Sequence, residues 1–306
     1  MNIDLIFPQL LNGLQYGILL FLLAAGLTLV FGIMNFVNLA HGSLYMLGAY
    51  FGATAFSLSG SFAVAVLAAV GGCVVLGFAL ERIAISRLYS RSHLDHVLAT
   101  FGLVLFFNEM AKIIWGPQPY FLPVPQFLDG TIDVFGITYP AYRFAIIAVG
   151  IAVAGGAHGL IHGTRLGMLI RAGAANPKMV SALGVNIELL NAFLFALGSA
   201  LAGLAGVMAG PILSVQVGMG EPVLITTLVV IVIGGIGSVN GAFYAALIVG
   251  IADTLGRAFL PTLLRELMSR DLANAAGPAL ASMLIYVLMA VVLAFRPDGL
   301  FPSGRK

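Results

Sequence analysis

The chain has 306 residues, of which 60% are hydrophobic and only 8% are charged, and its formal net charge is +2. Soluble globular domains carry about 25% charged residues, so this composition excludes a water-soluble fold, and the small net charge indicates no nucleic-acid partner. Apolar runs of about 18 residues or more recur along the chain, and each is long enough to cross a bilayer as a helix. The sequence therefore predicts an all-α, polytopic integral membrane protein.

Hydropathy predicts one transmembrane domain, residues 1–306, with eight or nine spans when Gly, Pro and charged residues are taken as breaks. The expected spans are residues 12–33, 39–58, 61–80, 97–115, 143–163, 188–210, 223–239, 241–260 and 279–295. Glycines in 39–58 and 223–260 suit broken or re-entrant helices as well as full crossings. The opening "MNIDLIFPQLLNG" lacks a basic n-region and a cleavage site, so we expect it to begin the mature chain.

Basic residues predict the orientation, because cytoplasmic loops retain Lys and Arg. They gather in three segments: Arg82, Arg87 and Arg91; Arg165, Arg171 and Lys178; and Arg296, Arg305 and Lys306. The loop 116–142 contains no Lys or Arg and is expected to be periplasmic. We therefore expect an odd number of crossings, with the N-terminus outside and the C-terminus inside. Arg265 and Arg270, in the turn 262–277, are the exception to this rule.

Two polar stretches are expected to interrupt helices within the membrane: "GIMNFVNLAHGS" (32–43) and "GGIGSVNGA" (234–242). Unwound backbone at membrane depth is tolerated only where protein or a watery cavity receives it, and in transporters it points to the translocation pathway. The candidate pathway residues are Asn35, Asn38, His41 and Gln216. The alternative is that residues 35–41 form a tight cytoplasmic turn between two spans.

Ionisable residues inside the spans are few. Glu109 and Lys112 are three residues apart, and Asp253 and Arg257 are four apart, so each pair shares a helix face. A lone charge at the bilayer centre costs about 2.5–3.5 kcal/mol on insertion scales, which favours pairing within each couple. Contact with the substrate or coupling to an ion is the alternative role, for which these two carboxylates are the only candidates.

The sequence contains no set of residues typical of an enzyme or a metal site. His158 and His162 are spaced as two metal ligands on one helix, but no third ligand is nearby, and Cys73 is the only cysteine. Residues 234–242 resemble a dinucleotide-binding glycine loop, yet the glycine spacing is wrong and no βαβ unit surrounds it. We therefore expect no catalytic residues, no metal and no cofactor.

Small residues recur every fourth position in the sixth expected span, at Gly198, Ala202, Gly206 and Gly210. Such spacing lets helix backbones approach closely in lipid, where apolar burial does not drive association. These small residues predict close packing inside the bundle, and contact with a second membrane subunit is the alternative.

The cytoplasmic loop 164–187 contains "RLGMLIRAGAANPKMVSALGVN" (165–186). Asn176 is a good N-cap, Pro177 fits the first helical turn and Gly184 can end a helix, so we expect a helix of about seven residues. Its apolar residues Met179, Val180 and Leu183 are expected on one side. Such a helix either rests on lipid headgroups or docks into a soluble partner.

Across its whole length the chain resembles the H-type permease subunits of ABC importers for branched-chain amino acids. The motifs that carry the resemblance are "NFVNLAHGSLYMLGAY" (35–50), "LATFGL" (98–103), residues 165–186, "IGGIGSVNGA" (233–242) and "RPDGLF" (296–301). The resemblance implies an ABC importer permease bundle in the bacterial inner membrane, with a second permease, two cytosolic ATPases and a periplasmic binding protein as partners. It also implies that the ATPase contacts Arg165, Gly167, Arg171, Asn176, Pro177, Met179, Leu183 and Gly184.

Gly173 departs from the bulkier residue that the family pattern leads us to expect, and it is predicted to loosen the helical turn before it. Two other functions remain open at this stage. A secondary transporter or channel would work without an ATPase, and related permeases import urea or short amides instead of amino acids.

Overall fold

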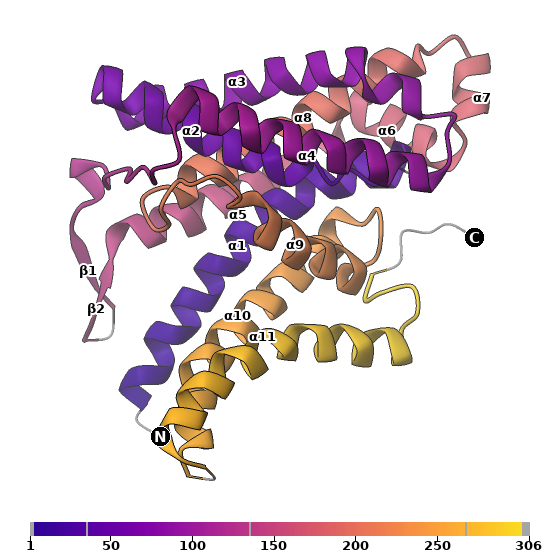
Figure 1. The fold of residues 1–306 in the computed structure, drawn as a ribbon. Helices are drawn as coiled ribbons and strands as arrows, with labels where there is room; N and C mark the ends of the chain where they lie inside the picture. Colours follow the sequence, from indigo (N-terminus) through magenta and orange to yellow (C-terminus); the bar gives the residue numbers. More distant parts are fainter. Residues whose placement is uncertain (1–2, 35, 135, 267, 302–306) are drawn as a thin grey trace.

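A computed structural model describes residues 3–34, 36–134, 136–266 and 268–301, which form a bundle of helices with one small hairpin (Figure 1). The helices are α1 (Ile3–Met34), α2 (His41–Ser59), α3 (Phe62–Ile83), η1 (Ile85–Leu88), α4 (His93–Trp115), η2 (Gln126–Leu128), α5 (Ala141–Gly163), α6 (Arg165–Ala175), α7 (Pro177–Ala182), α8 (Ile187–Ala209), α9 (Gly220–Gly234), α10 (Val239–Leu264) and α11 (Arg270–Phe295). Strands β1 (Thr131–Val134) and β2 (Ile137–Pro140) pair antiparallel, with Thr131 opposite Pro140.

Seven of the described helices are long and apolar enough to cross a membrane: α1, α3, α4, α5, α8, α10 and α11. The other two predicted spans correspond to α2 and α9. The 15 residues of α9 extend only about 22 Å, which is less than the thickness of a hydrocarbon core. All nine predicted spans are therefore helical, and the fold is the all-α polytopic bundle that the sequence predicts, with the hairpin as an unpredicted addition.

The ends of the helices separate into two groups. Helices α6 and α7 lie at one end of the bundle together with the C-terminal segment, residues 296–301, and the β1–β2 hairpin lies at the other (Figure 1). The predicted orientation assigns the first end to the cytoplasm, because it carries the basic loops, and the hairpin end to the outside. The turn between α10 and α11 lies near the start of α1 (Figure 1), which agrees with an outside position for Arg265 and Arg270 despite their charge.

Helix α8 is central and packs against α1, α2 and α3 through small residues. A Cβ added at Gly198 would lie 2.9 Å from the carbonyl oxygen of Gly26, and one at Gly203 would lie 2.8 Å from that of Ala69. Contacts this close require a glycine in one of the two helices, because a side chain would not fit between them. The small residues of α8 therefore pack inside the bundle, as the sequence predicts, and the pairs Gly13/Gly17 and Gly48/Gly52 likewise pack against α10 and α8.

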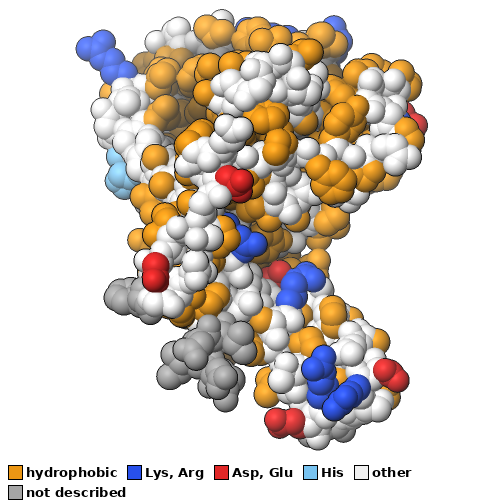
Figure 2. Space-filling model, turned by 90° about the vertical axis from the view of Figure 1, so that its left-hand side faces the viewer, with side chains coloured by type: hydrophobic (Ala, Val, Ile, Leu, Met, Phe, Trp, Pro, Cys, Tyr) orange, Lys and Arg blue, Asp and Glu red, His pale blue; other side chains and the backbone are white. Residues whose placement is uncertain are grey.

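The hairpin end of the molecule carries few charged side chains. Seen from that side, a broad upper part is joined to a smaller lower lobe on which charged groups gather (Figure 2). Residues at the α10–α11 turn supply Arg265, Glu266, Arg270 and Asp271, all of which are exposed. Charge on this face is therefore concentrated at one turn.

Candidate functional site

The loop 164–187 folds as two short helices whose starts are set by side-chain caps. The predicted orientation assigns it to the cytoplasm, so we call it the cytoplasmic loop and its end of the bundle the cytoplasmic end. Thr164 Oγ1 accepts a hydrogen bond from the Gly167 N–H at 3.0 Å and begins α6. Asn176 Oδ1 accepts from the Met179 N–H at 3.0 Å and begins α7, which Gly184 follows with φ +88°. The predicted second helix, its cap and its end are confirmed, whereas α6 was not predicted as a helix.

The turn from α5 into α6 requires glycine at position 167. A Cβ there would overlap the carbonyl oxygens of Leu160 and Ile161, so any other residue would push the two helices apart. Arg171 holds the same corner by donating to the Ile161 carbonyl oxygen. Gly173 is buried and lies within a continuous α6, so the helix is not broken at this residue.

The tip of the loop exposes apolar side chains. Met179 is 60% exposed and Leu183 is 78% exposed, whereas Val180, predicted to share their face, is 6% exposed and packs inward. Arg165 and Lys178 are also exposed. The loop thus presents two large apolar side chains beside cations, fixed on short capped helices.

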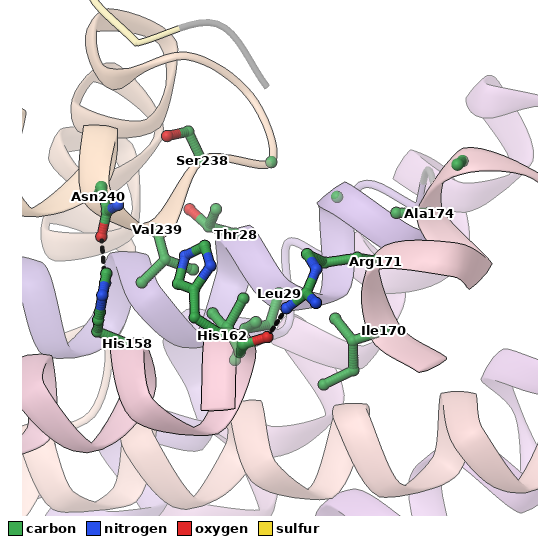
Figure 3. A pocket seen from close by; sticks show the side chains of 14 residues that line it. Thr28, Leu29, His158, His162, Ile170, Arg171, Ala174, Ser238, Val239 and Asn240 are labelled. Carbon is green, nitrogen blue, oxygen red and sulfur yellow. Dashed lines mark hydrogen bonds between the residues drawn. The ribbon is translucent and has the colours of Figure 1, made fainter. Parts of the chain in front are cut away.

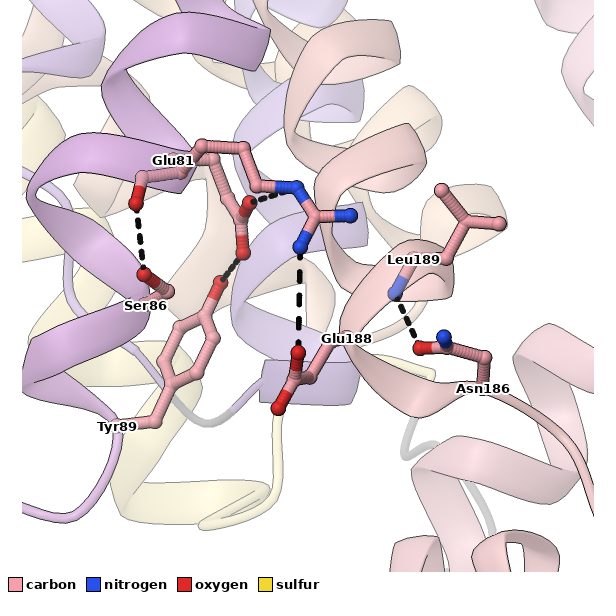
Figure 4. A network of polar contacts seen from close by, with 7 residues as sticks. Glu81, Ser86, Tyr89, Asn186, Glu188 and Leu189 are labelled. Atoms are coloured by element: carbon pink, nitrogen blue, oxygen red, sulfur yellow. Dashed lines mark hydrogen bonds and ion pairs between the residues drawn. The ribbon is translucent and has the colours of Figure 1, made fainter.

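A polar network anchors the end of this loop to the end of α3 (Figure 4). Asn186 caps α8, and the next turn places Glu188 3.9 Å from a guanidinium nitrogen of Arg82. The neighbouring Glu81 is 1% exposed and accepts a hydrogen bond from the Tyr89 hydroxyl at 2.7 Å. Burial and this bond to Glu81 raise the pKa of Tyr89, so the phenol remains a donor.

The network continues into the membrane. The Tyr89 ring packs edge-on against Phe36, with ring centroids 6.2 Å apart, and Phe36 follows the end of α1. A series of side-chain contacts therefore runs from Glu188 through Arg82, Glu81 and Tyr89 to Phe36, and it connects the cytoplasmic loop with the break between α1 and α2.

That break lies inside the bundle. After α1 ends at Met34, the chain turns back, and His41 Nε2 lies 3.2 Å from the carbonyl oxygen of Leu23. Leu23 is eleven residues before Met34, which corresponds to about 16 Å along a helix. The start of α2 also lies beside Gly26, which packs on the midpoint of α8 at Gly198. Residues 36–41 are therefore an unwound segment inside the bundle that leads into α2, and not a tight turn at the end of the bundle.

Helix α9 also begins inside the bundle, next to the start of α2. A Cβ at Gly42 would lie 2.7 Å from the carbonyl oxygen of Gly220, and one at Gly220 would overlap that of Gly42. Residues 210–219 lead inward from the outer end of α8, and Val215 pairs with Tyr120 of the loop 116–142. The N-terminal ends of two interrupted helices thus meet at backbone distance in the interior.

The second predicted interruption is in the wrong place. Residues 234–242 form the turn between α9 and α10 at the cytoplasmic end, where the Phe301 N–H donates to the Gly234 carbonyl oxygen at 3.0 Å. Ser238 caps a continuous α10 of 26 residues, so 241–260 is a full crossing. The glycines mark a tight turn beside the C-terminal segment. The actual interruption, at 210–219, begins with Gly210–Pro211, a turn signal that the prediction did not use.

The predicted pathway residues have different surroundings. Asn38 and His41 are each 1% exposed, and within the described chain neither polar atom of the Asn38 amide has a hydrogen-bond partner. Gln216 is exposed, and Asn35 lies outside the described residues. Asn38 and His41 therefore share the buried, unwound stretch at the start of α2, while the structure does not bring Gln216 into the same buried site.

Sequence reasoning identified two carboxylates in the spans, and the structure adds two more that are buried or partly buried, Glu81 and Glu221. Glu81 is buried at the end of α3, and Glu221 accepts a hydrogen bond from the Asn108 amide at 2.6 Å in the first turn of α9. Glu221 was missed because the predicted span began at 223. The two predicted ion pairs are confirmed: Lys112 Nζ lies 2.6 Å from Glu109, and Arg257 Nε lies 2.8 Å from Asp253.

Among the described residues, no group of three or more His, Cys, Asp and Glu side chains is arranged to hold a metal ion. The His158 and His162 rings lie 4.5 Å apart by their centroids, at the cytoplasmic end of α5. Cys73 is buried, and its thiol lies 3.4 Å from the Leu44 carbonyl oxygen.

Comparison with known proteins identifies the family. Residues 9–293 match the family described as "Branched-chain amino acid transport system / permease component". The chain belongs to this family. It is therefore a multi-pass permease component of the inner membrane, and the proteins that it resembles are transport subunits rather than enzymes.

Individual relatives are similar along nearly the whole chain. The high-affinity branched-chain amino acid transport system permease protein BraD of Pseudomonas aeruginosa is 29% identical over 305 residues, covering 95% of this chain and 94% of BraD. The corresponding protein LivH of Escherichia coli is 28% identical over 311 residues, with the same coverage. A probable branched-chain amino acid transport permease protein of Methanocaldococcus jannaschii is 28% identical and covers 78% of each chain. No solved structure matches the chain.

Proposed function

We propose that this chain is the translocating subunit of an ATP-driven importer for branched-chain amino acids. The family match supports the transport system, and the relatives named above are permeases of branched-chain amino acids. The proposal that ATP drives transport rests on the exposure of Met179 and Leu183 in the loop 164–187. The capped helices of this loop would present the two side chains to the cytoplasm.

An ATPase that hydrolyses ATP in the cytosol must transmit force through a rigid contact at the membrane surface. The exposed apolar tip of α7, with the cations Arg165 and Lys178 beside it, supplies such a contact. Apolar anchors in a partner's groove, with charge at the rim, are the usual composition of a specific interface. We assign the docking role to Arg165, Gly167, Arg171, Asn176, Pro177, Met179, Leu183 and Gly184.

Translocation is assigned to the junction where α2 and α9 begin. Helix N-termini carry a partial positive charge and unpaired N–H groups, which suit the carboxylate of an amino acid. Asn38, with its unpartnered buried amide, precedes α2, and His41 is the first residue of that helix. Movement of the loop would reach this junction through the contacts from Glu188 to Phe36, and would open it to each side of the membrane in turn.

The substitution Leu183→Asp tests the docking role. It places a charge in the proposed apolar contact, so ATP-dependent uptake of radiolabelled leucine should be lost while the protein remains in the membrane. Leu183→Met is the matched control, because it keeps an apolar side chain of similar volume and should retain uptake. Normal uptake by the Asp variant would refute the assignment.

Purification of the tagged chain in a mild detergent tests the assembly. We expect a second permease and two ATPases to co-purify, with a binding protein joining when substrate is present; mass spectrometry would identify them. A homo-oligomer that transports without ATP would instead indicate a secondary transporter or channel. Competition of leucine uptake by excess valine, but not by urea or acetamide, would confirm the substrate class.

A further inference from the structure

A cavity of about 430 Å³ lies at the cytoplasmic end of the bundle. The proposed transport mechanism gives the cavity itself no role, although Arg171 of the proposed docking set lines it. Its walls come from α1, α5, α6 and the turn between α9 and α10 (Figure 3). The cavity is therefore bounded on one side by the proposed coupling loop and on the other by the start of α10.

The polar side chains of this cavity are positive or neutral. Arg171 from α6 contributes a guanidinium, and His158 and His162 from α5 contribute two imidazoles, whereas none of the lining residues is acidic. The single bond of Arg171 to the Ile161 carbonyl oxygen leaves other guanidinium N–H groups available, because the group has five. Such a set of donors suits an anion.

The start of α10 adds to the same preference. Ser238, Val239 and Asn240 line the cavity, and they form the N-cap and first turn of a helix of 26 residues. Ser238 Oγ accepts a hydrogen bond from the Gly241 N–H at 3.0 Å. The N–H groups of Val239 and Asn240, the first two residues of the helix, are those that a helix leaves without an internal partner. The partial positive charge of a helix N-terminus favours a negative ligand there.

Thr28 provides an independent indication that a ligand belongs in this space. Its side chain is 1% exposed, lines the cavity and extends into it (Figure 3), yet Oγ1 has no hydrogen-bond partner within the described part of the chain. An unsatisfied buried hydroxyl costs about 1–3 kcal/mol. A ligand oxygen at the cavity floor would accept from this hydroxyl and remove that cost.

The remaining wall is apolar and adjoins the lipid-facing side of α5. Leu29, Ile161 and Ile170 line the cavity, and Ile151, further along α5, is 57% exposed. The cavity has room for a phosphate and the groups next to it, while attached acyl chains would lie outside against the membrane helices. Basic pockets at the cytoplasmic ends of membrane helices are suited to acidic headgroups.

We propose that this cavity binds a phosphate group, held by Arg171, His162, Thr28 and the start of α10. The phosphate belongs either to an anionic phospholipid or to a free phosphate ion. Because Arg171 is on α6 and Ser238 precedes α10, the bound anion would join the coupling loop to the opposite wall of the cavity, at the start of α10. This inference does not depend on which substrate the permease carries.

The test uses the full-length chain in a neutral detergent with three probes: dioctanoyl phosphatidylglycerol, dioctanoyl phosphatidylcholine and inorganic phosphate. The shift in unfolding temperature is measured against probe concentration, and native mass spectrometry counts the bound phosphatidylglycerol. Arg171→Gln and Thr28→Val should each weaken the binding of the stabilising probe by roughly tenfold, because each substitution removes a hydrogen-bond donor to the anion. Thr28→Val keeps the shape of the side chain and remains informative if the arginine variant does not fold.

Arg87→Gln is the matched control. Arg87 is an exposed arginine of the same end, and its guanidinium also donates to a backbone carbonyl oxygen, that of Ile83, but it does not line the cavity. Stabilisation by phosphatidylglycerol alone supports a lipid headgroup, and stabilisation by inorganic phosphate as well supports a free anion. Equal stabilisation by phosphatidylcholine, no stabilisation by any probe, or an equal effect of Arg87→Gln would overturn the proposal.

Discussion

The cytoplasmic loop and the interior junction of α2 with α9 are held in place by opposite means. The loop is organised by its own side chains: Thr164 and Asn176 cap its two helices, and Gly184 follows the second with a positive φ. The junction is organised by backbone meeting backbone, at Gly42 and Gly220, between segments far apart in the sequence. Substitutions in the loop should therefore act locally, and substitutions at the junction should affect the whole bundle.

The largest effect is expected from Gly220→Ala. The added methyl group would overlap the carbonyl oxygen of Gly42, and neither backbone can move without shifting its helix. Overpacking of this kind destabilises by about 1–3 kcal/mol, occasionally more, so the unfolding midpoint and uptake should both fall sharply.

Gly102→Ala in α4 is the control for this prediction, because a Cβ at Gly102 meets nothing within 4 Å. Alanine is the better helix former by roughly 0.5–1 kcal/mol, so this variant should be at least as stable as the parent. Equal behaviour of the two alanine variants would show that the junction is not closely packed.

A smaller effect is expected from His41→Ala. The substitution removes the contact between the His41 ring and the Leu23 carbonyl oxygen and leaves space at the start of α2. A lost buried hydrogen bond is worth about 1–3 kcal/mol when a partner is left unsatisfied. We expect altered KM and maximal uptake rate while the ATPase stays bound. His93→Ala, at an exposed histidine of α4, should leave both constants unchanged; unchanged constants in the His41 variant would argue against a pathway there.

The same contrast explains what the sequence could predict. The helix at 177–182 follows from Asn176, Pro177 and Gly184, because caps act on neighbouring residues. All nine hydrophobic spans were found for a similar reason: each is an uninterrupted local pattern. The polar stretch around His41 also marked its break correctly.

The position of the second break was not predicted, although Gly210–Pro211 marks where α8 ends. Glycines at 234–242 suggested it, but they form a turn beside the C-terminal segment, whereas α9 begins at Gly220 because Gly42 of another helix lies against it. Glu221 was missed for the same reason. Neither contact leaves a local signal, since the partner residues are more than 100 positions away in the chain.

A local effect is expected from Asn176→Ala, which removes the cap of α7. An N-cap of this kind contributes about 1 kcal/mol, and the loss should speed amide hydrogen exchange in residues 178–184 by roughly fivefold without moving the global unfolding midpoint. Lys178→Ala leaves the cap in place and should exchange like the parent. A fall in the global midpoint of the Asn176 variant would mean that the loop and the bundle unfold together.

The smallest effect is expected from Glu109→Gln, which tests whether the pathway involves the charges of α4. Glu109 and Lys112 are 66% and 46% exposed, and a pair on one exposed helix face contributes about 0.2–0.5 kcal/mol. The variant should therefore match the parent in stability and in leucine uptake. A secondary transporter that used Glu109 as its coupling carboxylate would lose concentrative uptake on this substitution. Such a loss, in a protein that still folds, would move the site of transport from the α2–α9 junction to α4 and would remove the need for an ATPase at the loop.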